Sequence, residues 1–326
     1  MKLTRRLTSA LLFGSAAALA LPTAALAQDY PSRPIELIVP WAAGGGTDAT
    51  GRIVAELLSQ VLGQPINVVN RTGGGGVVGH TEIANATTDG YTLGVITTEL
   101  SMFTHAGTSP INFENFSPVA LYNQDPVALH VAASSDVTDA AGLAAAIAAR
   151  PGAMNASGAN FGGVAHLGMV GFLLANDLPA DSVVWIPSEG AAPSLQELAA
   201  GTVQIVSTTM PEAASMVAAG EARVIGVLSD ARLASAPDVP TMVEQTGNAA
   251  SFGAWRGIAG PAGMPDDVVA RLSEAMTEVA ANPEFAELMG ARGFGVSFLP
   301  ADQFGAFLAD RDAAFGAAMS AAGLGR

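Results

Sequence analysis

From residue 30 onward, short apolar runs alternate with longer segments whose apolar residues recur every three or four positions. The runs at 35–39, 66–69 and 91–97 predict buried strands. The segment 47–62 predicts a helix, because its apolar residues fall on one stripe: Ile53, Val54, Leu57, Leu58, Val61 and Leu62. Strand and helix alternate here with short connections, which predicts a parallel sheet.

A second unit of the same kind is predicted to begin near Val127. Its strand-like runs lie at 127–132, 183–187, 203–207 and 223–228, and its helical runs at 139–149, 162–176, 192–200 and 211–219. Residues 252–260 predict an extended segment that crosses back. Helices are predicted at 265–281, 284–291 and 301–322, and we expect this tail to return to the first unit. The pattern therefore predicts an α/β protein built from two units.

The N-terminus has the three parts of a secretory signal peptide. Lys2, Arg5 and Arg6 precede an apolar stretch at 10–21, and Ala25-Leu26-Ala27 forms a cleavage motif before Gln28. The apolar stretch is shorter than the roughly 20 residues that a membrane span needs. We therefore predict an exported protein cleaved after Ala27; a buried amphipathic helix is the alternative.

Composition removes several classes of function. The chain has 29 acidic and 14 basic residues, a net charge of −15, and loss of the leader would make it −18. This balance disfavours a nucleic-acid partner, which needs basic patches. The chain has no cysteine, its only lysine is Lys2, and its four histidines lie far apart. Thiol nucleophiles, a phosphate-binding lysine loop and a helical histidine metal motif are thereby excluded, and we expect no metal and no cofactor.

Three glycine-rich loops are predicted to open helices: 44–46, 73–76 and 157–163. Glycines allow close approach of a ligand to the backbone, and helix starts offer free N–H groups to an anion. A dinucleotide fingerprint is one alternative, since Gly44, Gly46 and Ala49 satisfy its spacing. The acidic residue that would confirm it is missing, because the second strand ends in Asn70-Arg71. Purely structural turns are the other alternative.

No catalytic motif stands out. Ser157, His166 and Asp48 could be imagined as a triad, but their spacing matches no known pattern. We expect His166 to pack under its own loop or to donate one hydrogen bond, with ligand contact as the alternative. Glu99 and Glu189 are interpreted as solvated loop charges. Among the tryptophans, Trp41 either lines a cleft or simply packs, and Trp185 and Trp255 are expected in the core.

The order of short motifs along the chain resembles one known family. Near the N-terminus these are Tyr30-Pro31-Ser32-Arg33-Pro34-Ile35, Pro40-Trp41, Gly44-Gly45-Gly46-Thr47-Asp48 with Arg52, Leu62-Gly63-Gln64-Pro65, Asn70-Arg71 with Gly79, and Asp89-Gly90-Tyr91-Thr92-Leu93. Further on they are Ser157-Gly158, His166-Leu167, Pro187 with Gly190-Ala191-Ala192-Pro193, Leu195 with Gly201, Arg232 with Pro237-Asp238-Val239-Pro240-Thr241, and Trp255-Arg256-Gly257 with Pro261-Ala262-Gly263. The chain after the leader thus resembles the substrate-binding proteins of tripartite tricarboxylate transporters, the Bug family.

This resemblance implies a two-domain α/β periplasmic binding protein of type II, a Venus flytrap with its ligand cleft between the domains. Domain 1 would comprise 28–125 plus 252–326, and domain 2 would comprise 126–251. The implied function is capture of a small organic carboxylate, a di- or tricarboxylate first of all, and its delivery to the membrane permease subunits. The protein would act as a monomer, without catalytic residues. A periplasmic sensor that feeds a signalling receptor, or a periplasmic enzyme, is the alternative.

The resemblance also carries over a set of ligand contacts. In domain 1 they are Trp41, Ala43, Gly45, Thr47, Asp48, Gly76 and Thr97, and in domain 2 they are Ser157, Gly158, Asn160, Ser188, Glu189, Gly190 and Ala191. Many relatives have Tyr-Lys-Gly where this chain has Ser188-Glu189-Gly190, and the loop before His166 is one residue longer than usual. We therefore expect domain 2, with Glu189, to set specificity.

Overall fold

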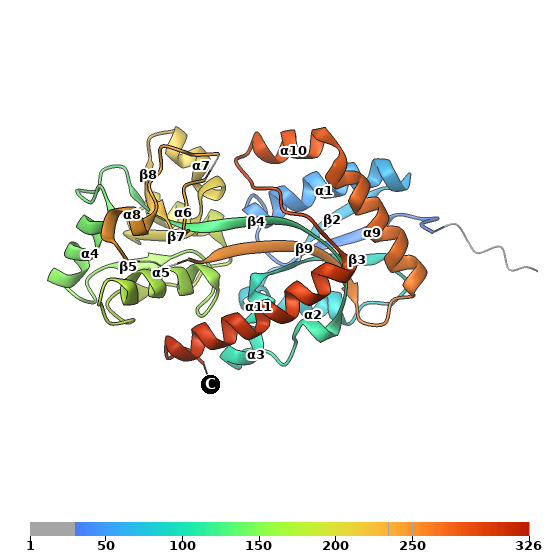
Figure 1. Ribbon diagram of the computed structural model, residues 1–326, viewed down its shortest axis with the longest axis horizontal. Coiled ribbons are helices and arrows are strands. Elements are labelled where there is room, and N and C mark those ends of the chain that lie inside the picture. Colours follow the sequence, from blue (N-terminus) through green and yellow to red (C-terminus); the bar gives the residue numbers. More distant parts are fainter. Residues whose placement is uncertain (1–29, 234, 249–250, 326) are drawn as a thin grey trace, which may run out of the picture.

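The computed structural model describes residues 30–233, 235–248 and 251–325, so the predicted signal peptide lies outside the described residues. Two α/β halves lie side by side and are joined by long strands (Figure 1). The first half begins with β1 (Ile35–Val39), α1 (Gly46–Leu62), β2 (Ile66–Asn70), η1 (Gly74–Gly76), α2 (Val77–Ala84), β3 (Thr92–Thr97), η2 (Thr98–Ser101), α3 (Phe103–Ala106), η3 (Phe113–Asn115) and β4 (Phe116–Ala132). The predicted strands and helices of this half are confirmed to within a residue or two.

The chain then builds the second half and returns. The second half contains α4 (Ala140–Ala149), β5 (Asn155–Ser157), α5 (Val164–Ala175), β6 (Val184–Trp185), α6 (Ala191–Ala199), β7 (Ile205–Thr209), α7 (Met210–Ala218), β8 (Ala222–Val227) and α8 (Met242–Thr246). The return consists of β9 (Gly253–Pro261), α9 (Asp266–Ala281), α10 (Pro283–Gly290), β10 (Leu299–Pro300) and α11 (Ala301–Ala321). The predicted helices are confirmed, whereas α8 and β10 were not predicted.

One sheet runs through both halves in the order β2-β1-β3-β9-β4-β7-β5-β6, with β8 and β10 also paired to β4. The pairs of β1 with β2 and β3 are parallel, as are those of β5 with β6 and β7. The crossing strands β4 and β9 are antiparallel to each other and to β3 and β7. The carboxyl ends of the parallel strands are where open α/β sheets bind ligands.

The predicted start of strand β4 at residue 127 was wrong. Strand β4 begins at Phe116 and pairs with β9 as far as Pro126, before it joins β7 and β8 in the second half. The polar run 123–125 interrupts the apolar pattern that predicts a strand. The structure still buries Asn123 and Asp125 within the strand, because both bond to Arg256 of β9.

Each half packs helices on both faces of its sheet. In the first half, α1, α9 and α10 bury one face, with Leu57 and Met276 in that core, and α2 and α11 bury the other. We predicted that the C-terminal tail returns to the first half, but its end also contacts the second half. Phe315 and Met319, near the end of α11, pack into the core of the second half, because a helix of 21 residues spans roughly 30 Å and outruns one half.

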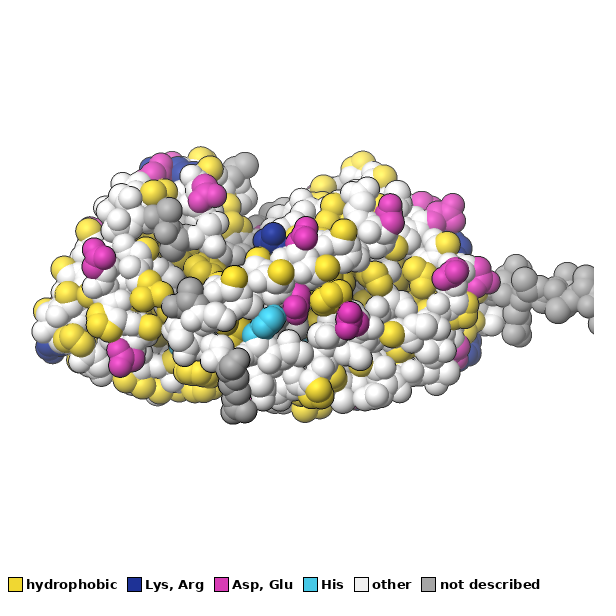
Figure 2. All heavy atoms as spheres, turned by 60° about the horizontal axis from the view of Figure 1, so that its bottom comes forward, with side chains coloured by type: hydrophobic (Ala, Val, Ile, Leu, Met, Phe, Trp, Pro, Cys, Tyr) yellow, Lys and Arg dark blue, Asp and Glu magenta, His cyan; other side chains and the backbone are white. Residues whose placement is uncertain are grey.

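The surface fits the acidic composition. On the face that Figure 2 shows, acidic side chains lie singly among apolar and uncharged ones, and Lys and Arg side chains are few. Within the described ranges, no helix has both the length and the apolar character that a membrane span requires.

Candidate functional site

A cavity of about 60 Å³ lies between the two halves. The first half contributes the segments after β1 and β3, the second half contributes the starts of α5, α6 and α7, and Arg256 lies between them on β9. Of the residues predicted to contact ligand, the cavity wall contains Trp41, Gly45, Thr47, Thr97, Gly158, Glu189, Gly190 and Ala191. The others, which do not line it, are Ala43, Asp48, Gly76, Ser157, Asn160 and Ser188.

Three helices begin at this cavity with glycine at the N-cap. These glycines are Gly45 before α1, Gly163 before α5 and Gly190 before α6, and none supplies a side-chain cap bond. Gly190 has a φ of 126°, which other residues rarely adopt. The first N–H groups of each helix therefore have no partner within the helix, and the helix dipole makes these starts attractive to an anion.

Trp41 lines the cavity and is fixed there. Its indole Nε1 donates to Thr97 Oγ1 at 3.2 Å, and that hydroxyl donates to Glu99 Oε2 at 2.7 Å. This settles the open question about Trp41, which is buried but forms part of the wall. Trp255 lies in the core as expected, whereas Trp185 is only partly buried.

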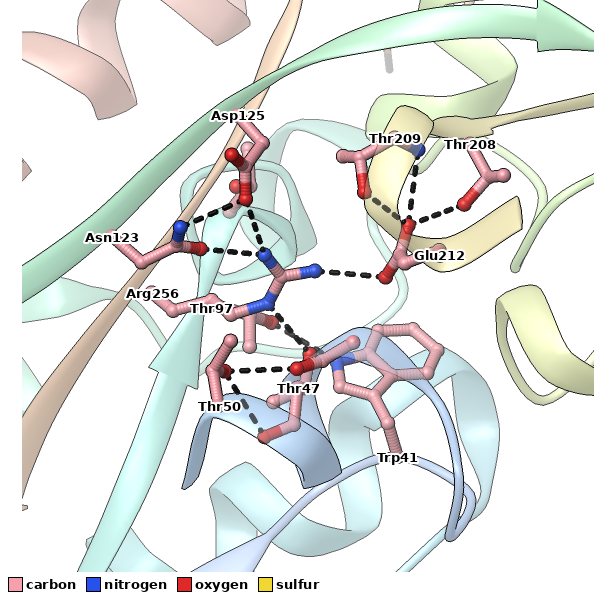
Figure 3. A network of polar contacts seen from close by, with 12 residues as sticks. Trp41, Thr47, Thr50, Thr97, Asn123, Asp125, Thr208, Thr209, Glu212 and Arg256 are labelled. Atoms are coloured by element: carbon pink, nitrogen blue, oxygen red, sulfur yellow. Dashed lines mark hydrogen bonds and ion pairs between the residues drawn. The ribbon is translucent and has the colours of Figure 1, made fainter. Parts of the chain in front are cut away.

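The charged centre of the wall is Arg256, which sequence reasoning missed (Figure 3). Its Nη2 donates to Glu212 Oε1 at 2.8 Å, and its Nη1 lies 3.4 Å from Asp125 Oδ2. The remaining bonds of its guanidinium go to Asn123 Oδ1 at 2.6 Å and Thr47 Oγ1 at 3.1 Å. A motif match contains Arg256, but only the fold brings β4, β9, α1 and α7 together around it.

Glu212 holds the other side of this ion pair. Its Oε2 accepts bonds from the Thr209 backbone N–H at 3.0 Å and from the hydroxyls of Thr208 and Thr209. Burial alone would raise its pKa, but the charge of Arg256 and these bonds hold the pKa of Glu212 below its ordinary value. Asp125 differs, since burial raises its pKa despite Arg256.

The interpretation of Glu99 as a solvated loop charge was wrong. Glu99 is 5% exposed, and it is one of the residues that line the cavity. Glu99 can be buried because Thr97 donates to it and because the backbone N–H of Val164, the first residue of α5, faces it. Burial raises the pKa of Glu99, while these donors and Arg256 oppose that shift.

Glu189 is exposed, as predicted, yet it borders the cavity. Its backbone carbonyl accepts a bond of 3.4 Å from the N–H of Ala42, across the two halves. Glu99 and Glu189 thus have opposite surroundings in the wall, with Glu99 inside and the Glu189 side chain at the solvent side.

Some predicted contacts instead shape the loops. Asp48 accepts bonds from the Gly44 N–H at 3.0 Å, from Arg52 and from Asn70. Ser157 Oγ donates to the Ile186 carbonyl at 2.7 Å. Two members of the imagined triad, Asp48 and Ser157, therefore have other hydrogen-bond partners.

Two other predicted contacts lie where the halves approach each other. The side chain of Asn160 packs against Gly75, where an added Cβ would come within 2.4 Å of it. Ser188 Oγ bonds to the Gly190 carbonyl at 3.0 Å and to Ser194. Both residues therefore act on loop geometry at the edge of the cavity.

Two buried histidines hold the glycine loops in place. His80 Nδ1 donates to the Gly76 carbonyl at 2.7 Å, and its Nε2 accepts from the Thr97 N–H at 3.2 Å. His166 does not line the cavity; its ring lies between Phe161 and Trp185, and its Nδ1 accepts from the Gly162 N–H. Burial lowers the pKa of each to about 4, so both are neutral near pH 7.

Across the part of the chain that the structure describes, no group of three or more His, Asp or Glu residues is placed to hold a metal ion. The cavity wall offers a ligand the backbone N–H groups of uncapped helix starts, threonine side chains, and Arg256 paired with acidic residues.

Known proteins match this chain over most of its length. Residues 50–324 match the model of the tripartite tricarboxylate transporter family receptor. Protein BugT of Bordetella pertussis is 30% identical over 318 residues, which cover 95% of each chain. Protein Rpa4515 of R. palustris, solved with adipate, has a TM-score of 0.85 at 25% identity, over 90% of this chain and 99% of that one. MatC from Rhodopseudomonas palustris, solved with bound malate, has a TM-score of 0.80 at 25% identity, over 89% and 99% of the two chains.

The predicted family and fold class are confirmed. The solved relatives include the periplasmic binding protein BugD, with a TM-score of 0.83 at 26% identity over 91% of this chain and 99% of that one. This family binds substrates for transport and is not a family of enzymes. The chain is a two-domain α/β binding protein, and it belongs to the family of tripartite tricarboxylate transporter receptors, the TctC or Bug family.

Proposed function

We propose that this protein captures a small organic carboxylate in the cavity between its halves and delivers it to the permease of a tripartite tricarboxylate transporter. One observation carries the proposal: the uncapped starts of α1 and α6, one from each half, face the same cavity. The adipate and malate bound by the similar proteins Rpa4515 and MatC are consistent with a carboxylate there. The di- or tricarboxylate that the resemblance favours stays a prediction.

Capture is proposed to work by closure of the two domains around the ligand. We propose domain 1 as 28–125 plus 252–326 and domain 2 as 126–251, with the hinge where β4 and β9 pass between the halves. Pairing of these strands up to Pro126 and Gly253 supports these limits. A ligand that touches α1 and α6 together would stabilise the closed state, since it binds both domains only there.

We further propose export to the periplasm with cleavage after Ala27, and action as a monomer. The order of basic head, apolar stretch and cleavage motif supports the first, together with the periplasmic relative BugD. N-terminal sequencing of the exported protein and its mass in solution test the two statements.

Substitution of Gly45 by valine should weaken binding of every carboxylate at least tenfold. Gly45 lines the cavity at the start of α1, and a Cβ there would meet only the Ala42 carbonyl, at 3.4 Å. The fold should therefore tolerate the side chain, while a carboxylate loses close approach to the α1 N–H groups. Titration calorimetry with a carboxylate panel measures the effect.

Gly290→Val is the matched control. Gly290 ends α10, and a Cβ there meets no atom within 4 Å. It should bind as the wild type does. Equal affinities of wild type and Gly45→Val for every carboxylate that binds would refute the assignment of the α1 start as the anchor.

A further inference from the structure

Glu99 lies beside one of the helix starts at the cavity. It lies on η2 in the first half, while α5 belongs to the second half, and the Val164 N–H that begins α5 faces its carboxyl. A carboxylate at the start of a helix takes the position that suits an anionic ligand group. The protein thus supplies its own carboxyl group at this position.

The other acidic group inside the wall, Glu212, occupies a second helix start. It forms a capping box with Thr209 at the beginning of α7 and bonds to Arg256. Among the helix starts at the cavity, those of α1 and α6 have no side-chain cap, and the Glu212 carboxylate, paired with Arg256, packs against Gly46 at the beginning of α1. The acidic residue in the first turn of α1, Asp48, bonds away from the cavity to Gly44, and the first turn of α6 has no acidic residue.

Among the described residues that line the cavity, no cation is left over for a second anionic group of the ligand. The charged residues of the cavity wall are Glu99, Glu189, Glu212 and Arg256. Arg256 is already paired with Glu212 and Asp125, and the sequence has no lysine after Lys2. A second ligand carboxylate would therefore face Glu99 or Glu212 without a counter-charge, which is unfavourable in a buried site.

The hydrogen bonds of Glu99 indicate which ligand groups it can bind. Thr97 Oγ1 donates to the Glu99 carboxyl, and the Val164 N–H faces it, so both neighbours use Glu99 as a hydrogen-bond acceptor. An acceptor in a cavity wall favours a ligand that carries a donor, an ammonium or a hydroxyl group, and disfavours one that carries another acceptor.

We propose that Glu99 determines specificity and restricts the ligand to small monocarboxylates that carry an amino or hydroxyl group. The single carboxylate lies at the starts of α1 and α6, and the donor group faces Glu99. This inference rests on the proposed function, because it assumes that a carboxylate binds in this cavity. It sets a monocarboxylate against the di- or tricarboxylate that the family resemblance favours, and titration with succinate decides between the two.

Titration of the mature protein with three probes tests the proposal: succinate, 4-aminobutyrate and 3-hydroxypropionate. The wild type should bind 4-aminobutyrate or 3-hydroxypropionate at least tenfold more tightly than succinate. Glu99→Gln keeps the size and an acceptor oxygen but removes the charge. It should reduce that ratio at least tenfold, mainly by improving the affinity for succinate.

Glu287→Gln is the matched control, since it removes an exposed carboxylate on α10 that does not line the cavity; it should change the ratio less than threefold. A wild type that prefers succinate, or a ratio that Glu99→Gln leaves unchanged, would overturn the role of Glu99 and leave carboxylate capture intact. Absence of saturable binding for these probes and for a wider carboxylate panel would overturn the proposed function and this inference with it. If Glu99→Gln does not fold, the wild-type preference among the probes decides alone.

Discussion

Replacement of Arg256 by methionine should lower the free energy of unfolding by about 3–5 kcal/mol, the usual range for breaking a buried ion pair from one side. The Arg256 side chain is 3% exposed, and its partners Asp125 and Glu212 are 6% and 11% exposed. Methionine fills much of the space but leaves two buried carboxylates without their cation. Urea unfolding at pH 7 measures the loss.

The surface pair of Arg232 with Glu244 gives the comparison. Its side chains are 42% and 44% exposed, so Arg232→Met should cost less than about 1 kcal/mol. The double variant Arg256→Met, Glu212→Gln should recover part of the loss, because one unpaired charge is gone. A loss below about 1 kcal/mol for Arg256→Met alone would show that the network around it does not hold the halves together.

Acid should destabilise the protein well above the pH at which carboxylates titrate. Burial lowers the pKa of His80, His130 and His166 from 6.5 to about 4 in the folded protein. Between these values the unfolded chain binds more protons than the folded one. The free energy of unfolding is therefore highest above pH 6.5 and falls as the pH drops toward 4, by up to about 1.4 kcal/mol per pH unit for each histidine.

His130→Gln isolates one of these contributions. Glu99 and Asp125, whose pKa values are raised, act in the opposite sense as the pH falls, so the total slope mixes both effects. Glutamine does not titrate, and the slope between pH 6.5 and 5 should shrink by about 1.4 kcal/mol per unit. Urea unfolding at several pH values measures it. The same slope in variant and wild type would mean that His130 is not buried in its neutral form.

The sequence predicted the fold well where local patterns decide it. The apolar stripe of α1 and the runs that form β1, β2 and β3 gave those elements nearly to the residue. The sequence did not predict the start of β4, because residues 123–125 of this strand are polar. The burial of Asn123 and Asp125 depends on Arg256, which lies 131 residues beyond Asp125 in the chain. No local pattern reports a partner that distant.

In the candidate site, too, the local features could be predicted and the long-range contacts could not. Glycine loops at helix starts are local features, and Gly45, Gly158 and Gly190 do lie at the cavity. Glu99 looks like any acidic residue after a strand. Its burial follows from Thr97 beside it and from α5, whose first N–H comes from the other half of the molecule. The acidic side of this site was visible only after folding brought the halves together.

Titration calorimetry of the mature wild-type protein with a panel of small carboxylates, followed by mass analysis of the recovered ligand, tests capture most directly. We expect saturable one-to-one binding of at least one small carboxylate, recovered unchanged, with an affinity that survives dialysis against a chelator. Failure of every carboxylate to bind, or recovery of a chemically altered ligand, would contradict a binding protein for carboxylates.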